Sequence, residues 1–282
     1  MGSEITVWWG PDDMVSALGF GTEENMAAVR AMKSSLASWH DSTPVCLIDR
    51  KRLGALAAER PGLAAERPAG KTGAAAAEPA PEQTAGAAAN PAAAAAGPAG
   101  ETAGPAGETA GAPAGAGQPP AEYTYMERLV LATLGGVVAR SGVTPADKRV
   151  LIVLATTKGE IGSLGSAPER CDLNRTAEVV GRHFGAAHRP LLISNACISG
   201  VSAIVIAARL IRSGRYDHVF VAGFDLLSDF IVSGFNAFKS VSPTLCRPYD
   251  ATRDGLTLGE ACGAVLLTRD RRLSATGVSV AG

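Results

Sequence analysis

The 282-residue chain carries 26 Lys and Arg against 27 Asp and Glu, a formal net charge of −1, which argues against a nucleic-acid or anionic-membrane surface. It has no apolar run as long as a membrane span and no charged N-terminal segment followed by an apolar core, so we predict a cytoplasmic protein. The five cysteines are an odd number without CxxC spacing. This pattern indicates neither a disulfide framework nor a zinc site, and we predict no metal and no cofactor.

Strand-like and helix-like segments alternate along most of the chain. Continuous apolar runs predict strands at residues 4–9, 149–157, 190–194, 218–224 and 263–268, with a short extended piece at 44–49. Helical patterns occupy residues 23–36, 123–142, 174–185 and 201–214, with Asn174 as the candidate N-cap of the third helix and Gly185 as its stop. Strands without polar alternation, separated by helices, indicate an α/β protein with a mostly parallel sheet covered on both faces.

Residues 54–121 interrupt this pattern. They consist almost entirely of Ala, Gly, Pro, Glu and Thr and include imperfect repeats such as LAAERPGLAAERPAG. A segment with so few large apolar side chains cannot offset the conformational entropy lost on folding. We therefore predict a disordered insertion at 54–121 within a single domain formed by residues 1–53 and 122–282.

Cys197 lies in the stretch LLISNACISGVSAIVIAARL, where strand-like residues give way to helix-like ones. The helix that follows is apolar around nearly its whole circumference, which predicts a buried central helix. A cysteine at a helix N-terminus meets free backbone N–H groups and the positive end of the helix dipole, which favour a thiolate. A small buried core cysteine is the alternative, and we expect that structural role for the other four cysteines, Cys46, Cys171, Cys246 and Cys262.

A second segment, CRPYDATRDGLTLGEACGAVLL, combines a charged loop with a carboxylate entering a buried strand. Together the two segments resemble the β-ketoacyl-acyl-carrier-protein synthases of the thiolase superfamily. In that family an A-C-x-x-G turn precedes, by about fifty residues, the motif R-P-[FWY]-D-x-x-R-D-G-[FL]-x-x-G-E-G, whose last glycine is replaced here by Ala261. The matching positions are Ala196, Cys197, Gly200, Arg247, Pro248, Tyr249, Asp250, Arg253, Asp254, Gly255, Gly259 and Glu260.

The resemblance implies roles for five residues. Cys197 would be the acyl-accepting nucleophile, and its backbone N–H one donor of the oxyanion hole. Phe235 and Ile198 would line the acyl pocket, although the family usually has Ala or Ser at the position of Ile198. Glu260 and Asp254 would support the site, and the usual partner of that glutamate is a lysine that has no counterpart here.

The resemblance also implies a fold and partners. We expect the N-terminal half of a thiolase-like fold, a five-stranded mixed, mostly parallel sheet with helices on both faces. The partners would be acyl and malonyl thioesters of an acyl carrier protein, with a homodimer or another ketosynthase chain as the subunit partner. In the family, two histidines that drive malonyl decarboxylation belong to a second half-domain, and the four histidines of this chain do not match them.

Three functions remain open at this point. The first is a condensing enzyme of fatty-acid or polyketide assembly, represented by its nucleophile half and inactive in condensation alone. The second is a non-catalytic ketosynthase-like subunit that supports dimerisation or chain length. The third is an acyl-transfer or acyl-binding protein that uses Cys197 without condensation.

Overall fold

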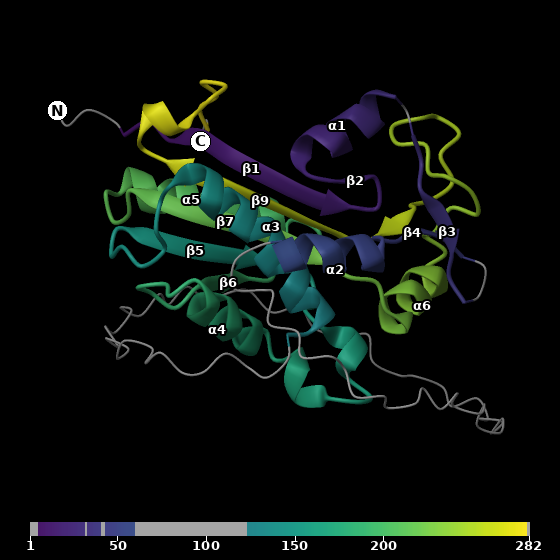
Figure 1. Ribbon diagram of the computed structural model, residues 1–282. Helices are drawn as coiled ribbons and strands as arrows, with labels where there is room; N and C mark the ends of the chain where they lie inside the picture. Colours follow the sequence, from purple (N-terminus) through teal and green to yellow (C-terminus); the bar gives the residue numbers. More distant parts are fainter. Residues whose placement is uncertain (1–4, 32, 41–42, 60–122, 281–282) are drawn as a thin grey trace, which may run out of the picture. The chain divides into compact units, whose positions relative to one another are not determined.

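The computed structural model describes residues 5–31, 33–40, 43–59 and 123–280 (Figure 1). The strands are β1 (Trp8–Ser16), β2 (Gly19–Phe20), β3 (Leu36–Ser38), β4 (Pro44–Cys46), β5 (Val150–Ala155), β6 (Leu191–Ile193), β7 (His218–Asp225), β8 (Leu258–Gly259) and β9 (Ala261–Thr268). The helices are α1 (Thr22–Arg30), α2 (Arg50–Glu59), α3 (Tyr125–Ser141), α4 (Leu173–His183), α5 (Ser199–Arg212) and α6 (Asp229–Ala237). Three short 3-10 helices lie at Ile161–Ser163, Pro168–Cys171 and Arg271–Leu273.

The main sheet is mixed, and its strand order is β2-β1-β9-β7-β5-β6. β5 pairs in parallel with β6 and β7, whereas β1 pairs antiparallel with β2 and β9, and β7 antiparallel with β9. The α/β class and the mixed sheet are confirmed, but the sheet has six strands, counting the two-residue β2, and fewer parallel pairings than we predicted. The apolar run of β9 reflects burial on both faces, and burial does not specify strand direction.

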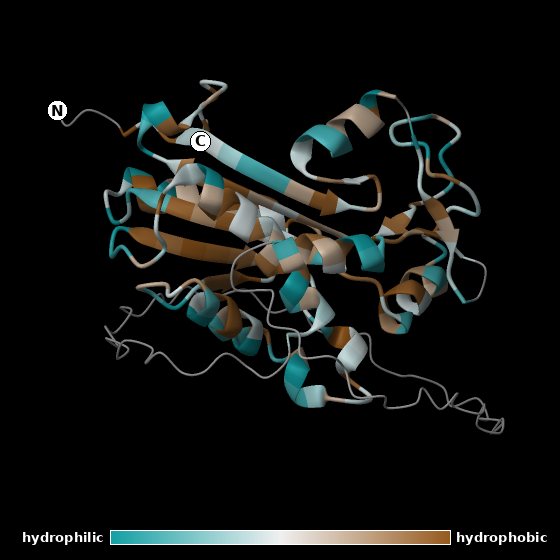
Figure 2. Cartoon of the chain, viewed as in Figure 1, coloured by the Kyte–Doolittle hydropathy of each residue, from teal (hydrophilic) through white to brown (hydrophobic). Residues whose placement is uncertain are grey.

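Helices cover both faces of the sheet (Figure 1). Along β5, Val150, Ile152 and Leu154 belong to the core on the side of α2, α3 and α4, whereas Leu151 and Val153 belong to the core under α5. Successive side chains of a strand point to opposite faces, so both sets must be apolar. Figure 2 shows the result as a continuous hydrophobic β5 between more mixed helices.

The ends of two helices on the first face have clear sequence causes. α3 begins with a capping box: the Thr124 side chain accepts from the Glu127 backbone N–H, and the Glu127 side chain accepts from the Thr124 backbone N–H. The helix ends at Gly142, whose φ is 65°. α4 is capped by Asp172, whose side chain accepts from the Asn174 backbone N–H. Asn174 was therefore the wrong prediction for the N-cap, because the Asp172 side chain, two residues earlier, accepts the free backbone N–H of Asn174.

The segment before the predicted insertion is longer than expected. α2 runs from Arg50 to Glu59, and Leu53 and Ala57 are buried on it. Residues 54–59 are thus helical rather than part of an insertion, because alanine favours the helix and these apolar positions find a core. The rest of the predicted disordered segment, 60–121, lies outside the described residues. No described helix is long and apolar enough to cross a membrane.

The helix that follows Cys197 is buried on one side only. Ala203 and Ala207 are fully buried against the sheet, but Val201 and Val205 keep 64% and 40% of their surface exposed. The prediction of a wholly buried central helix was wrong for these residues. Nothing in the described part of the chain packs on the outer face of α5, which exposes Val201 and Val205 beside Arg209.

Candidate functional site

Cys197 lies in the short connection between the end of β6 at Ile193 and the start of α5 at Ser199. Its side chain is exposed. The residue therefore sits at the carboxyl end of a strand and just before a helix N-terminus, where backbone N–H groups without partners in the helix point outward. This is the position that the sequence predicted for it.

The connection is a tight turn in a conformation that costs energy. Ala196 has φ 47°, a left-handed value for a residue with a Cβ, which costs roughly 1–3 kcal/mol and persists only where the surrounding structure enforces it. Ile198 N donates to Asn195 O at 3.2 Å, and Ser199 N donates to Ala196 O at 3.1 Å. These bonds fold the chain back on itself, so that Cys197 stands at the tip of the turn.

An apolar surface continues from the turn along α5. Ile198 is 57% exposed and lies at the helix cap, so it lies at the surface rather than inside a closed pocket in this chain. A shallow hollow of about 340 Å³ lies beside it, lined by Ile193, Asn195, Val201, Ser202, Val205, Ile206 and Arg209. Phe235, the other predicted pocket residue, is half-buried on α6.

Glu260 is the most deeply buried of the predicted site residues, at 2% exposure. Its carboxylate accepts hydrogen bonds from Ile48 N at 3.3 Å, from Leu227 N at 3.4 Å and from the Arg50 guanidinium at 2.9 Å. A buried carboxylate needs such partners, because removing its charge from water is costly. The cation that the resemblance left unassigned is thus supplied by Arg50, at the start of α2.

Arg50 also contacts an aromatic ring. Its guanidinium carbon lies 3.4 Å from the ring centroid of Tyr125, at the start of α3, a stacking arrangement that favours both groups. Burial raises the pKa of the Tyr125 hydroxyl to about 12, so the phenol stays neutral and adds no charge beside Glu260. Arg50, Tyr125 and Glu260 form one cluster that joins α2, α3 and the start of β9.

Asp254 belongs to a different cluster, in the loop before β8. Ser242 Oγ donates to its carboxylate at 2.8 Å, and Arg247 lies 3.1 Å away; the hydrogen bond from Ser242, followed by the Arg247 charge, lowers the pKa of Asp254. No hydrogen bond or ion pair in the described residues joins Asp254 to Glu260 or Cys197. The structure therefore places the predicted supporting residues in two separate clusters.

A third cluster was missed by the sequence analysis. Asp225 ends β7, and its carboxylate accepts from Thr156 Oγ1 at 2.9 Å, from Thr157 N at 3.0 Å and from Thr157 Oγ1 at 2.9 Å. β5 and β7 are parallel neighbours, so polar residues that follow both strands meet at the same edge of the sheet. In the sequence, this cluster could have been recognised from the polar residues that end the two apolar runs, in ATT (155–157) and GFD (223–225).

Cys262 and the four histidines make structural contacts. Cys262 is fully buried in the sheet, and burial raises the pKa of its thiol to about 12. His183 lies 3.0 Å from the Tyr123 hydroxyl, and His218 lies 2.8 Å from Thr268 Oγ1. The remaining two histidines contact Lys148 O (His188, 2.9 Å) and the Trp39 ring (His40, centroids 5.1 Å apart).

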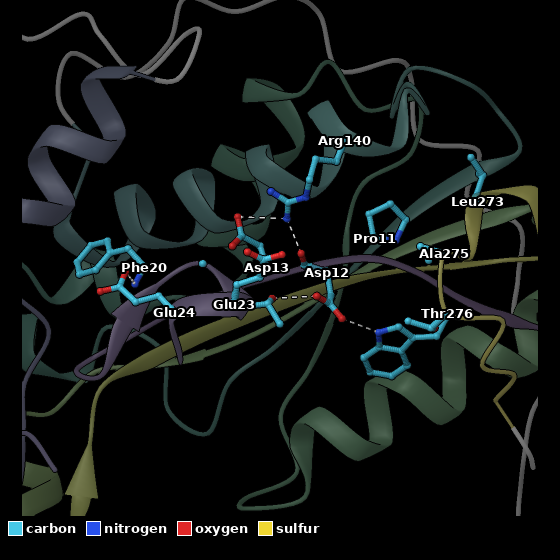
Figure 3. Close-up of a pocket in the computed structure, with 14 residues that line it drawn as sticks. Pro11, Asp12, Asp13, Phe20, Glu23, Glu24, Arg140, Leu273, Ala275 and Thr276 are labelled. Atoms are coloured by element: carbon cyan, nitrogen blue, oxygen red, sulfur yellow. Dashed lines mark hydrogen bonds and ion pairs between the residues drawn. The ribbon is translucent and has the colours of Figure 1, made fainter. Parts of the chain in front are cut away.

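A cavity of about 900 Å³ lies elsewhere, between β1 and α1 (Figure 3). Arg140 bonds the Asp12 carbonyl and lies 3.4 Å from the Asp13 carboxylate, while the Asp12 side chain accepts from Trp9 Nε1 and Thr22 Oγ1 at 2.8 Å each. Arg140, Asp12 and Asp13 are thus held by neighbouring protein groups, and none of the five predicted site residues lines the cavity. Within the described ranges, no cluster of three or more His, Cys, Asp or Glu residues is arranged to hold a metal ion.

Comparison with known families gives a match over more than half of the chain. Residues 112–272 match the family described as "Beta-ketoacyl synthase, N-terminal domain". Nodulation protein E of Rhizobium meliloti (strain 1021) is 29% identical over 154 residues, which cover 53% of this chain and 36% of that protein. The putative polyketide beta-ketoacyl synthase 1 of Streptomyces cyaneus is 28% identical over 141 residues, 45% of this chain and 33% of that protein.

Solved structures share the fold at low sequence identity. A beta-ketoacyl synthase from Burkholderia phymatum STM815 matches with a TM-score of 0.61 at 17% identity, over 97% of this chain and 62% of that one. A ketosynthase (ApeO) in complex with its chain length factor (ApeC) from Xenorhabdus doucetiae matches with a TM-score of 0.58 at 19% identity, over 96% and 60%. The chain thus spans about a third of the length of the two curated relatives.

Proposed function

The chain belongs to the β-ketoacyl synthase family, and from that premise we propose that Cys197 is the nucleophile that accepts an acyl group from a carrier-protein thioester. One observation carries the proposal: the exposed cysteine at the tip of a strained strand-to-helix turn. A cysteine kept only for packing has no reason to occupy such a position, and the buried Cys262 illustrates the structural alternative.

The loading step needs only groups that this chain can offer. The Cys197 sulfur attacks the thioester carbonyl, and the oxygen takes up negative charge in the tetrahedral intermediate. The bond to the departing sulfur then breaks, which leaves an acyl-cysteine and a free carrier thiol that receives the proton of Cys197. The backbone N–H of Cys197, just before the N-terminus of α5, is suited to stabilise the oxygen.

Condensation requires more than loading. In a β-ketoacyl synthase, decarboxylation of a malonyl thioester gives a carbanion that attacks the acyl-cysteine, and the family uses two histidines for this step. The four histidines here are engaged with Tyr123, Lys148, Thr268 and Trp39. We therefore expect the 282-residue chain alone to load an acyl group without forming a 3-ketoacyl product.

The other predicted site residues are assigned supporting roles in the same proposal. Ile198 and Phe235 border the acyl chain, with Ile198 on the exposed surface beside the nucleophile. Glu260 and Asp254 shape the loops around the site, each held by an arginine at 2.9 and 3.1 Å respectively. The loading step as proposed uses no metal or cofactor.

Two kinds of partner belong to the proposal. The first is an acyl carrier protein, which delivers the thioester. The second is another ketosynthase-fold subunit, either a copy of this chain or a related one, as in the solved ketosynthase with its chain length factor. β6 ends the main sheet, and its open edge is the element that pairs between subunits in the family. The exposed Cys197 favours a loaded subunit over a purely non-catalytic one.

The test is acylation of the purified 282-residue chain by an acyl-carrier-protein thioester, read by mass spectrometry of the peptide that contains Cys197. We expect an acyl adduct on Cys197, none on Cys262, and none at position 197 after Cys197→Ala. Malonyl carrier protein is then added and the mixture analysed for 3-ketoacyl product. No adduct on Cys197 would overturn the proposal, and condensation by the chain alone would overturn the restriction to loading.

A further inference from the structure

We propose that Ser199 is a positioning residue that holds the Cys197 turn in the conformation needed for acylation. This inference rests on the proposed function of Cys197 as an acyl acceptor. Ser199 is 4% exposed and is the first residue of α5. The Ser199 hydroxyl forms hydrogen bonds with the backbone of the two residues before Cys197, and not with the backbone of the helix that Ser199 begins.

The Ser199 hydroxyl closes the turn with two short hydrogen bonds. It accepts from Asn195 N at 2.8 Å and donates to Ala196 O at 2.6 Å. The bonds flank the peptide unit in which Ala196 adopts its left-handed φ of 47°. A hydroxyl has one proton to donate and lone pairs to accept, so a single serine satisfies both backbone groups.

An ordinary helix cap would use this serine differently. A capping serine accepts from a backbone N–H two or three residues further along the helix, whereas Ser199 accepts from Asn195, four residues before it. The residue at the cap position is Ile198, and it makes no side-chain cap bond. The geometry therefore serves the turn and not the stability of α5.

Ser199 also connects the turn to the sheet edge. Its Oγ lies 3.4 Å from Thr156 O, and Thr156 N donates to Ile193 O at 3.2 Å. Thr156 in turn donates its hydroxyl to Asp225. The ends of β5, β6 and β7 thus support the serine from below, so the turn has a rigid base against which its strained residue is held.

The consequence is chemical, because acylation and alkylation of a cysteine make different demands. Attack on a thioester creates an oxyanion that backbone N–H groups must meet at a fixed place, whereas alkylation by iodoacetamide displaces iodide from carbon and forms no oxyanion. A turn that loses its shape should therefore slow acylation more than alkylation. A loss of exposure or of folding would slow or accelerate both reactions together.

The experiment compares the two reactions at Cys197 in the 282-residue chain and three variants. Acylation is measured with an acyl N-acetylcysteamine thioester and alkylation with iodoacetamide, both by mass spectrometry of the Cys197 peptide. Ser199→Ala removes the hydroxyl, and Ser199→Thr retains it. Ser213→Ala is the matched control, since Ser213 Oγ bonds Leu210 O at 2.9 Å at the other end of the same helix.

We expect Ser199→Ala to slow acylation about tenfold or more, a fraction of the loss seen when an oxyanion donor is removed outright, while alkylation changes less than about threefold. Ser199→Thr should restore most of the acylation rate, and Ser213→Ala should leave both rates unchanged. Equal effects of Ser199→Ala on the two reactions, or no effect on either, would overturn the role of Ser199.

Two further readings keep the outcomes separate. If Ser199→Ala does not fold, hydrogen exchange of the parent chain tests the inference instead. The Asn195 N–H donates to Ser199 Oγ and should exchange slowly with solvent; fast exchange would overturn the inference. If the parent chain is alkylated at Cys197 but never acylated, the proposed function fails. If the parent is acylated and Ser199→Ala is acylated equally fast, only the inference about Ser199 fails.

Discussion

Arg50 Nη2 lies 2.9 Å from Oε1 of Glu260, so a residue before the low-complexity segment holds a carboxylate in the motif near the end of the chain. The Glu260 side chain is wholly buried, whereas the Arg50 side chain is 52% exposed. Such a pair is asymmetric: the arginine can be hydrated without its partner, but the carboxylate cannot. The main effect of removing Arg50 should therefore be to leave the buried Glu260 carboxylate without its positive partner.

We expect Arg50→Met to lower the free energy of unfolding by about 1–3 kcal/mol, less than for a fully buried pair because the arginine is half-exposed. Urea denaturation provides the measurement. Arg52→Met is the control, since Arg52 pairs with Glu24 at the surface, where a loss under about 1 kcal/mol is expected. Adding Glu260→Gln to Arg50→Met should recover part of the loss, and strict additivity of the two changes would contradict the coupling.

Gly255 is required by a close backbone approach in the loop that carries Asp254. Its φ is 156°, and a Cβ there would lie 2.4 Å from Ser242 N. We expect Gly255→Ala to destabilise the chain by at least about 2 kcal/mol in thermal or urea unfolding. Gly54→Ala on α2, with open space around it, should instead stabilise by up to about 1 kcal/mol; similar effects of both would refute the steric argument.

His183 should make stability depend on pH. Burial lowers its pKa, so the unfolded chain binds a proton more readily than the folded one, and the free energy of unfolding must fall as the pH drops below about 6.5. The urea midpoint of the parent should be lower at pH 5.5 than at pH 7.5, and His183→Gln should reduce this difference. An unchanged pH dependence in His183→Gln would contradict the prediction.

The sequence alone placed two of the candidate site residues correctly in the fold. Cys197 at a strand-to-helix junction and Glu260 at the entry of a buried strand are both recognisable from neighbouring residues. Arg50 was not, because the ion pair joins residues 210 positions apart and no local pattern specifies which of the 26 Lys and Arg residues pairs with a buried carboxylate. The sequence shows Ser199 only as a small residue close to Cys197, because its role depends on the direction of its hydrogen bonds.

The fold shows the same division between local and non-local information. The helices α3 and α4 follow from apolar periodicity and local caps, apart from the shift from Asn174 to Asp172. The direction of β9 could not be predicted, because a strand covered on both faces is apolar in either direction. The exposed face of α5 could not be predicted either, because the hydropathy of its side chains does not show whether another part of the chain packs on them.

That exposed face leads to a final prediction about the isolated chain. Val201 is 64% exposed beside the turn that carries Cys197, whereas Ala207 on the opposite side of α5 is fully buried. An exposed apolar stripe promotes association in water.

We expect Val201→Gln to reduce self-association in sedimentation velocity and to change the free energy of unfolding by less than about 0.5 kcal/mol. Ala207→Gln should cost at least about 2 kcal/mol, because it forces a polar side chain into a packed core. If Val201→Gln proved as destabilising as Ala207→Gln, the outer face of α5 would have to be packed against other parts of this chain, and the surface next to Cys197 would not be open.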